Sequence, residues 1–249
     1  MKEKDRNKLV VTRHRMVVTR HTTLERFSHY ANIFSLAGLI ASGFFVYLGL
    51  PYLQYSDAYA IHILCAAVFL AINWIVIPYS AIADGRMFEF WFTPSDLRRL
   101  WAIAGNFFTG SEYPRYTIYD ERKRKFKNRL HPLTKLLLYS HYVALLVVTI
   151  TGIAIYSRSI TPLGVNISGI IMTVLDFVSP LLMLSGVELA RILHLAAAYW
   201  FIIEVVLHAG LVQLDPRKIQ HMKSIFVDGR EDLMTDPTAE IQNMLEDEE

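Results

Sequence analysis

The stretch VELARILHLAAAYWFIIEVVLHAGLV, residues 187–212, is apolar along nearly its whole length and carries two histidines, His194 and His208. The fourteen residues between them rise roughly 21 Å in an α-helix and return to nearly the same face. This helix therefore directs two imidazoles to one side at two different depths.

Composition places this helix in a membrane. Hydrophobic residues make up 53% of the 249 residues, the mean hydropathy is +0.30, and the apolar residues fall in runs near the length that spans hydrocarbon. We predict an all-α integral membrane protein, a bundle of four transmembrane helices over residues 30–49, 59–83, 136–156 and 187–212. A fifth apolar stretch, residues 165–186, contains Asp176 and Pro180.

Basic residues predict the orientation. Eight Lys or Arg precede the first span, eleven lie between residues 84 and 135, and four follow the last span, whereas the other two connections carry only Arg158 and Arg191. Under the positive-inside rule both termini face the cytoplasm, which requires an even number of crossings. Residues 165–186 are then expected as an outer-side interfacial helix, with the question of a crossing left open.

We expect one membrane domain over residues 1–249, in the cell membrane of a prokaryote. Residues 1–28 form a retained cytoplasmic arm, because they lack the apolar core of a cleavable signal, and residues 213–249 form a cytoplasmic tail. Residues 94–107 show a helical apolar pattern and predict a short helix on the inner surface. The single cysteine, Cys65, excludes disulfides within the chain, Cys-ligated clusters and a CxxCH haem site.

Depth sorts four intramembrane histidines into two pairs. With the N-terminus inside, His29 and His208 lie near the inner side, and His62 and His194 near the outer side. A single imidazole in hydrocarbon can simply hydrogen-bond a neighbouring helix. Two pairs at two depths permit two b-type haems, each of which needs two neutral imidazoles, although spacing alone does not identify the cofactor. Basic partners for inner propionates are available at Arg13, Arg20 and Arg26.

The segment Thr23–Tyr30, TLERFSHY, resembles the ERxxHW-type entry to the first span in dihaem cytochrome b subunits of membrane-bound nickel–iron hydrogenases and formate dehydrogenases. The resemblance continues with a histidine early in span two, Thr151-Gly152 in span three, and the His-x13-His pair of span four. Asp215–Gly229 is similar to the segment after the last helix in formate dehydrogenase gamma subunits. The family implies His29 and His208 as inner and His62 and His194 as outer haem ligands.

Leu130–Lys135, LHPLTK, resembles the NPLxQ or NxxQK entry to span three, which borders the quinone pocket in that family. His131 and Thr134 stand where the family usually has Asn and often has Gln. The carrier is therefore open between menaquinone, ubiquinone and a methanophenazine-like lipid, and His131 also has an ordinary interpretation as a solvated interfacial residue.

Two further groups inside the spans have open roles. His141 in span three is interpreted as a propionate partner, a proton donor to the carrier or a helix–helix hydrogen bond rather than as a replacement ligand. Glu204, one turn before His208, can orient an imidazole, relay a proton or stay protonated. We group both residues with His131 and Thr134 as a candidate carrier site.

The resemblance implies a respiratory electron-transfer subunit. It would pass electrons from an extracytoplasmic iron–sulfur subunit, attached to a hydrogenase or formate dehydrogenase catalytic subunit, through two non-covalent b haems to the lipid carrier. The chain itself would lack a hydrogen- or formate-oxidising site. Its partners would be those subunits and membrane lipid, without nucleic acid, and higher oligomers of the complex are allowed.

Two alternatives remain at the level of sequence. A free-standing b561-type cytochrome would use the same histidines without a multisubunit partner. A haem-free transporter would use histidines for zinc or protons, but it would require ligands that converge at one depth, whereas these histidines divide between two.

Overall fold

The computed structural model describes residues 15–156 and 162–243. Within them the chain divides into two compact units. The bundle unit comprises residues 27–86 and 133–214, and the strand unit comprises the described parts of residues 1–26, 87–132 and 215–249. Arg13 and the end of the predicted tail, residues 244–249, lie outside the described residues.

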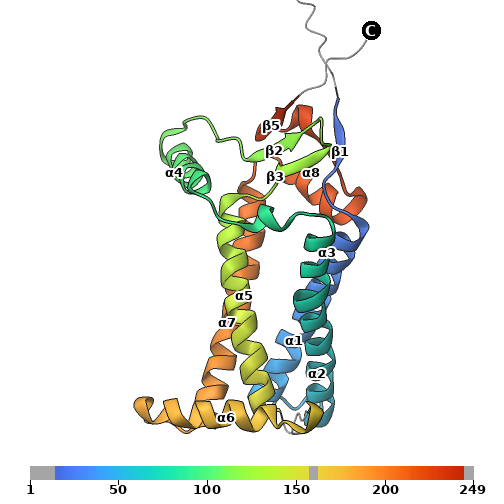
Figure 1. Cartoon of the computed structure of the whole chain (residues 1–249). Coiled ribbons are helices and arrows are strands. Elements are labelled where there is room, and N and C mark those ends of the chain that lie inside the picture. The colour runs from blue at the N-terminus through green and yellow to red at the C-terminus, as the bar shows by residue number, and fades with distance from the viewer. Residues whose placement is uncertain (1–14, 157–161, 244–249) are drawn as a thin grey trace, which may run out of the picture. The chain divides into compact units, whose positions relative to one another are not determined.

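Four helical rods build the bundle unit (Figure 1). They are α1 (Thr23–Leu48), the continuous run of α2 (Tyr55–Ala71), the π-helix η1 (Ile72–Val76) and α3 (Ile77–Ala83), α5 (Pro132–Ile155) and α7 (Gly186–Leu214). Each rod is long and apolar enough to cross a membrane. This confirms the predicted four-helix membrane fold. The rods begin one to seven residues before the predicted apolar runs, because helices continue into polar residues at the interface, and they end within two residues of them.

All four rods contribute to one apolar core. Its buried centre consists of Phe69, Ala144, Leu145, Ala197 and Phe201, and side chains from α1 pack against it. On α1 three serines spaced by seven residues, Ser28, Ser35 and Ser42, are buried. Small residues on one face allow membrane helices to approach closely. The hydroxyls of Ser35 and Ser42 donate hydrogen bonds to backbone carbonyls of the preceding turn.

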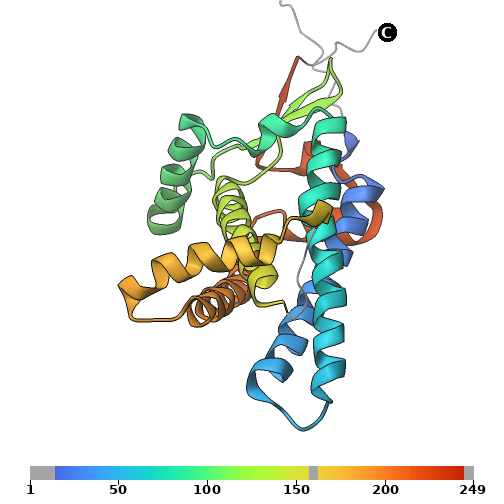
Figure 2. The ribbon, with the colours of Figure 1, turned by 60° about the horizontal axis from the view of Figure 1, so that its bottom comes forward.

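The fifth apolar stretch forms a separate, shorter helix. After the 3-10 turn η3 (Pro162–Gly164), α6 (Ile167–Val178) begins at Asn166, whose side chain accepts from Gly169 N, and it continues into η4 (Ser179–Leu182). Figures 1 and 2 show α6 running across the ends of α5 and α7 rather than along them. Asp176 Oδ1 accepts from Gly186 N at 3.0 Å and ties α6 to the start of α7.

The side chains of α6 and η4 that do not contact α7 are largely exposed. Phe177, Leu181 and Met183 are 84%, 83% and 96% exposed. A helix of this length with one tied end and one apolar face is suited to lie within a membrane interface. The predicted location on the outer side stays a prediction.

The strand unit contains short strands that the all-helical prediction did not include. β1 (Val17–Thr19) pairs antiparallel with β4 (Arg230–Asp232). β2 (Thr117–Asp120) pairs antiparallel with β3 (Lys125–Asn128) and parallel with β5 (Ala239–Gln242). These strands have three or four residues each, too few for an alternating apolar pattern to be visible in the sequence.

Helices of the strand unit are also short, except one. η2 (Met87–Phe90), α8 (Lys218–Lys223), the π-helix η5 (Ser224–Asp228) and η6 (Leu233–Thr235) connect the strands. α4 (Pro94–Thr109) matches the predicted residues 94–107, opens with a capping box between Thr93 and Asp96, and ends at Gly110 with a φ of +67°. Leu97, Trp101, Phe107 and Phe108 on α4 are exposed. Its predicted place on the inner membrane surface remains a prediction.

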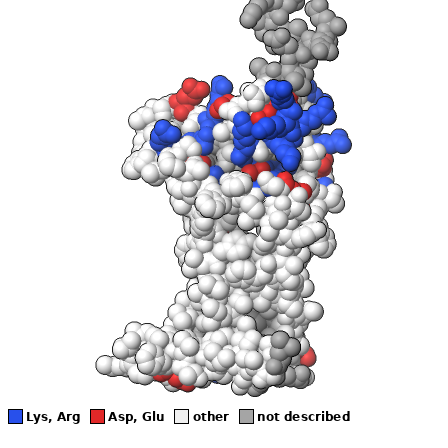
Figure 3. Space-filling view, in the orientation of Figure 1, with Lys and Arg blue, Asp and Glu red and all other residues white. Residues whose placement is uncertain are grey.

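Charge is distributed very differently over the two units. Figure 3 shows almost no Lys or Arg along the bundle helices, and a dense group of Lys and Arg side chains on the strand unit. The exposed basic residues of the β2–β3 hairpin belong to this group: Arg122, Lys123, Arg124, Lys125 and Lys127. This distribution is the one expected for a unit solvated by lipid and a unit solvated by water.

Replacement of Gly38 on α1 by alanine tests the close packing of α1 against α2. A Cβ at this position would lie 2.5 Å from Cys65 Sγ, so Gly38→Ala is expected to lower the thermal unfolding midpoint in detergent through overpacking of about 1–3 kcal/mol. Adding Cys65→Ala removes the sulfur and is expected to restore most of the loss. Gly210→Ala, where a Cβ meets no atom within 4 Å, is the control, and equal midpoints for Gly38→Ala and Gly210→Ala would contradict the packing argument.

Candidate functional site

The bundle unit brings the imidazoles of His62 on α2 and His194 on α7 close together. Their ring centres are 6.3 Å apart, with 56° between the ring planes. A metal–imidazole bond of about 2 Å plus about 1.1 Å from nitrogen to ring centre predicts about 6 Å between two imidazoles on opposite sides of one iron. The observed spacing fits that arrangement.

Hydroxyl groups orient both rings. Ser42 Oγ lies 3.2 Å from His62 Nδ1 and donates its hydrogen to Gly38 O. Thr151 Oγ1 lies 2.9 Å from His194 Nδ1 and donates to Val147 O. Because each hydroxyl has only one hydrogen, each must accept from the ring. Nδ1 therefore carries the proton in both histidines, and Nε2 keeps the lone pair that an iron ligand needs.

A glycine follows each of these hydroxyl residues. A Cβ on Gly43 would lie 3.4 Å from His62 Cε1, and one on Gly152 would lie 3.4 Å from His194 Cε1. Both distances lie at the lower limit of ordinary van der Waals contact, so the glycines leave the rings their room. We call Ser42-Gly43 and Thr151-Gly152 the hydroxyl–glycine pairs. The hydroxyl acceptors and the space beside the rings fit a b-type haem between the two imidazoles, and the role of these histidines as iron ligands stays a prediction.

The second predicted pair, His29 on α1 and His208 on α7, also lies within the bundle unit. The two imidazoles are close enough to interact electrostatically, and the Glu204 carboxyl also lies within electrostatic range of His208. His208 lies fourteen residues after His194 on the same helix, which is roughly 21 Å along the axis. The two pairs therefore occupy two levels of one bundle.

Between these levels lies a hydrogen-bonded group that we call the polar layer: Asn32, Asn73, His141 and Glu204. Each residue comes from a different rod. His141 Nδ1 is 3.1 Å from both carboxylate oxygens of Glu204, and His141 Nε2 is 3.2 Å from Asn73 Oδ1. Asn73 Nδ2 donates to Asn32 Oδ1 at 2.8 Å and to Phe69 O at 2.8 Å. Both ring nitrogens of His141 are thus engaged, which agrees with a role other than iron ligand.

Asn32 and Asn73 were not among the predicted site residues. Their signal in the sequence is the presence of two amides inside otherwise apolar spans, where an unpaired amide is costly. Asn73 sits in the π-helix η1, and such single π-turns occur often at functional positions because they shift a side chain out of the regular register. The shift directs Asn73 to two other rods.

The predicted carrier-site residues fall into separate groups. His141 and Glu204 are together in the polar layer, and Thr134 lies in the first turn of α5. His131 belongs to the strand unit, where its Nε2 is 2.9 Å from Tyr113 Oη and its ring packs edge-on against Tyr116 at 5.0 Å. The carrier role of all four residues stays a prediction.

The predicted propionate partners Arg20 and Arg26 have partners within the strand unit. Arg26 donates to the carbonyls of Ile225 and Val227 at the end of η5. Arg20 is 3% exposed and pairs with Glu231 at 2.6 Å. Within the strand unit, Arg26 therefore binds backbone carbonyls and Arg20 binds a carboxylate. The haem contact of Arg26 stays a prediction.

A buried ionic cluster organises the strand unit around Arg217. Its guanidinium pairs with Asp215 at 3.1 Å, Asp236 at 3.0 Å and Glu231 at 3.5 Å. It also stacks on Tyr116, whose hydroxyl donates to Asp215 Oδ2 at 2.5 Å. Burial alone would raise the pKa of Asp215, but the hydrogen bond and charge of Arg217 outweigh burial and lower that pKa to about 2.

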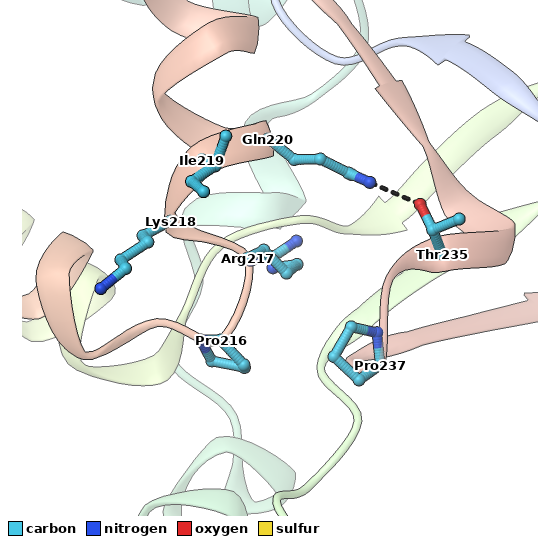
Figure 4. Close-up of a pocket in the computed structure, with 7 residues that line it drawn as sticks. All are labelled: Pro216, Arg217, Lys218, Ile219, Gln220, Thr235 and Pro237. Carbon is cyan, nitrogen blue, oxygen red and sulfur yellow. Dashed lines mark hydrogen bonds between the residues drawn. The ribbon is translucent and has the colours of Figure 1, made fainter.

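Beside this cluster is a small open pocket of about 170 Å³. Figure 4 shows the residues that line it and the hydrogen bond from Gln220 to Thr235. Arg217 reaches the pocket wall, but its donors are already used by the carboxylates and by Thr117. The Arg217 charge is therefore not available to a ligand, and we assign the pocket no ligand.

His131 and Tyr113 are both held neutral near pH 7. Burial lowers the pKa of His131 to about 4 against the smaller opposing effect of Asp215. Burial, reinforced by Asp215, raises the pKa of Tyr113 to about 12. The bond between them therefore joins an uncharged imidazole and an uncharged phenol.

Replacing Thr151 by valine tests the orientation of His194. Loss of the hydroxyl leaves Nδ1 without its acceptor, so the haem affinity at the outer pair is expected to fall about 10- to 100-fold. Haem content after dilution, measured as the pyridine haemochromogen, reports this loss. Thr173→Val on α6, where the hydroxyl only bonds Gly169 O in its own helix, is the matched control, and equal haem retention in both variants would contradict the role of Thr151.

Acid sensitivity of the strand unit tests the state of His131. Between pH 6.5 and about 4 the unfolded chain binds a proton at this residue that the folded chain does not bind, so the free energy of unfolding falls as pH falls, by on the order of 2 kcal/mol. His131→Asn is expected to remove this fall and to leave the later loss, from about pH 4 towards 2, that Asp215 causes. Thermal unfolding midpoints at pH 7, 5.5 and 4.5 measure this loss of stability, with His221→Asn as the control. The same pH dependence in the wild type, His131→Asn and His221→Asn would refute the assignment of the loss to His131.

Comparisons with known proteins identify the family. Residues 20–226 match the family model described as prokaryotic cytochrome b561. The chain is 34% identical over 222 residues to the F420 non-reducing hydrogenase II cytochrome subunit of Methanosarcina mazei, which covers 86% of this chain and 82% of that protein. No solved structure matches. A family match over four membrane helices shows a membrane electron-transport protein whose cofactor is b-type haem, and the chain belongs to the prokaryotic cytochrome b561 family.

Proposed function

We propose that this chain is the membrane-anchoring cytochrome b subunit of a hydrogenase complex, and that it carries electrons through two b haems to a lipid-soluble carrier. The arrangement of two histidine levels on α7, each with a partner histidine on another rod, is the observation that supports it most. Haem supplies reversible one-electron chemistry when bound. The protein supplies the axial ligands, their orientation and an apolar enclosure.

Each pair has a defined contribution. His62 and His194 would hold the outer haem, with the hydroxyl–glycine pairs fixing the Nδ1–H tautomer and making room for the rings. His29 and His208 would hold the inner haem. A separation of roughly 21 Å between levels leaves the macrocycle edges much closer to each other than the irons, which suits electron tunnelling along the bundle.

The relative's name supports a hydrogenase partner. Methanosarcina mazei uses the related chain as a hydrogenase cytochrome subunit, and we transfer that role to this chain. The electron donor would be an iron–sulfur subunit on the outer side, attached to the catalytic subunit. A formate dehydrogenase partner is the alternative within the same resemblance. In this proposal the chain would have no hydrogen- or formate-oxidising site of its own.

For the carrier we propose a menaquinone, ubiquinone or methanophenazine-like lipid reduced near the inner haem. Among the candidate contacts, Thr134 lies in the first turn of α5 and His131 lies in the strand unit. A neutral imidazole bonded to a phenol can donate or accept a hydrogen bond without a change of charge. This is the behaviour required of a group that faces a carbonyl or a ring nitrogen at the edge of hydrocarbon.

The proposed orientation follows from charge. Exposed basic side chains of the strand unit (Figure 3) and the basic connections support a cytoplasmic location for both termini in the cell membrane. Residues 1–28 would then be the inner arm, residues 213–249 the inner tail, and α6 the outer interfacial helix. Reduction of the carrier would take protons from the inner side, so that inward electron flow contributes to the membrane potential.

Four single replacements test the haem frame. The purified chain is expected to hold about two non-covalent b haems. His62→Ala and His194→Ala should each lose the same haem, identified by its midpoint potential in a reduced-minus-oxidised titration, and His29→Ala and His208→Ala should each lose the other. His221→Ala, a histidine of the strand unit, is the control and should keep both haems. Losses that do not group in these pairs would refute the assignment of ligands.

The partner is tested separately from the haems. Membranes that contain the complex are expected to reduce both haems under hydrogen, and a soluble quinone or phenazine analogue is expected to reoxidise them. Haem reduction by a carrier but not by hydrogen or formate would favour a free-standing b561-type cytochrome. A folded chain without haem would favour the transporter, although among the described residues no three His, Cys, Asp or Glu side chains gather as a metal site.

A further inference from the structure

The polar layer is a closed group within the part of the bundle that faces hydrocarbon. Asn73 is 2% exposed, and the side chains of His141 and Glu204 are 15% and 14% exposed. Aromatic rings surround the imidazole, with Phe69 at 6.1 Å and Phe201 at 5.2 Å between ring centres. Such a layer has no need of a carrier to complete its hydrogen bonds.

The bonds of the layer define where its protons are. Asn73 Nδ2 donates to Asn32 Oδ1 and Phe69 O, so Asn73 Oδ1 is left as the acceptor. His141 Nε2 must therefore donate to it. The remaining bond, from His141 Nδ1 to Glu204, contains one proton, either on the carboxyl or on the ring.

This pair is neutral overall with one shared proton, whichever atom carries it. A neutral pair is the least costly state for two ionisable groups away from water. A second proton would place a net positive charge in the bundle. That state becomes favourable only when a negative charge arrives nearby.

Reduction of the proposed inner haem would bring such a negative charge close to the pair. Glu204 lies four residues before His208 and ten after His194 on α7, roughly 6 Å and 15 Å along the axis. Charges at these separations interact strongly in a low-dielectric interior and are little screened by salt. The inner haem level is the nearer one.

We propose that the His141–Glu204 pair is a proton-loading site for the inner haem. This rests on the proposed two-haem function. When an electron from a low-potential donor, such as the iron–sulfur partner, reduces the iron between His29 and His208, one proton from water binds the pair. The pair then holds an N–H at His141 Nδ1 and an O–H at Glu204, whichever of the two atoms carried the first proton. The proton returns to water when the electron leaves for the carrier.

Other ionisable groups around the pair are few. On α7 they include His208, which interacts with Glu204 electrostatically without a hydrogen bond between them. On α5 there is Tyr142, which donates to Asn73 O at 3.2 Å. On α1 there is His29, one turn before Asn32, and on α2 Cys65, one turn before Phe69. The π-helix η1 contributes no ionisable side chain.

The test is a redox titration of both haems in the purified holoprotein, followed by absorption at pH 6, 7 and 8. In the wild type one haem, the one that His208→Ala removes, is expected to show a midpoint potential that falls as pH rises. Glu204→Gln and His141→Gln should each abolish this shift and keep both haem spectra. Glu188→Gln, the same change at the exposed start of α7, where Glu188 bonds only Ser185, should retain it.

A direct measurement covers the case in which a variant fails to fold. The wild-type holoprotein in unbuffered solution is expected to take up protons on reduction, counted with a pH indicator, together with a carboxyl change in the redox infrared difference spectrum. Two haems with pH-independent potentials, or an unchanged shift in folded Glu204→Gln, would overturn this inference alone. A chain without two haems would instead overturn the function on which it rests.

Discussion

The bundle depends on one constraint: hydrocarbon offers no hydrogen-bond partners, so every polar side chain within the spans must be satisfied by another part of the bundle. His62 and His194 meet hydroxyls of neighbouring helices, and His141 meets a carboxylate and an amide. These contacts determine how the four rods are rotated about their axes. The same contacts set which ring nitrogens remain available as ligands.

The two hydroxyl–glycine pairs show how the bundle solves one problem twice. Ser42-Gly43 on α1 serves a histidine of α2, and Thr151-Gly152 on α5 serves a histidine of α7. In both cases the hydroxyl fixes the tautomer and the glycine removes a Cβ that would press on the ring. Placing these groups on the helix beside the ligand keeps each imidazole oriented before any cofactor binds, and such preorganisation lowers the cost of binding.

The strand unit follows the opposite rule because water surrounds it. Its interior holds charges rather than excluding them, and Arg217, Arg20 and Arg129 each pair with buried carboxylates. Arg20 and Arg129 also donate to each other's backbone carbonyl. Short strands and 3-10 turns cannot bury much apolar surface, so multidentate guanidinium contacts define their register instead.

The sequence by itself determined the membrane class, the four spans, the separate helices α4 and α6 and the two histidine levels, because apolar run length and the 3.6-residue period are properties of one helix at a time. Only the tertiary structure decided that His141 and Glu204 bond to each other, that Asn32 and Asn73 complete their layer, and that Arg20 and Arg26 hold the strand unit. These facts depend on how helices are rotated against one another and on contacts such as Arg20 with Glu231, which are 211 positions apart. No periodicity along a single segment carries that information.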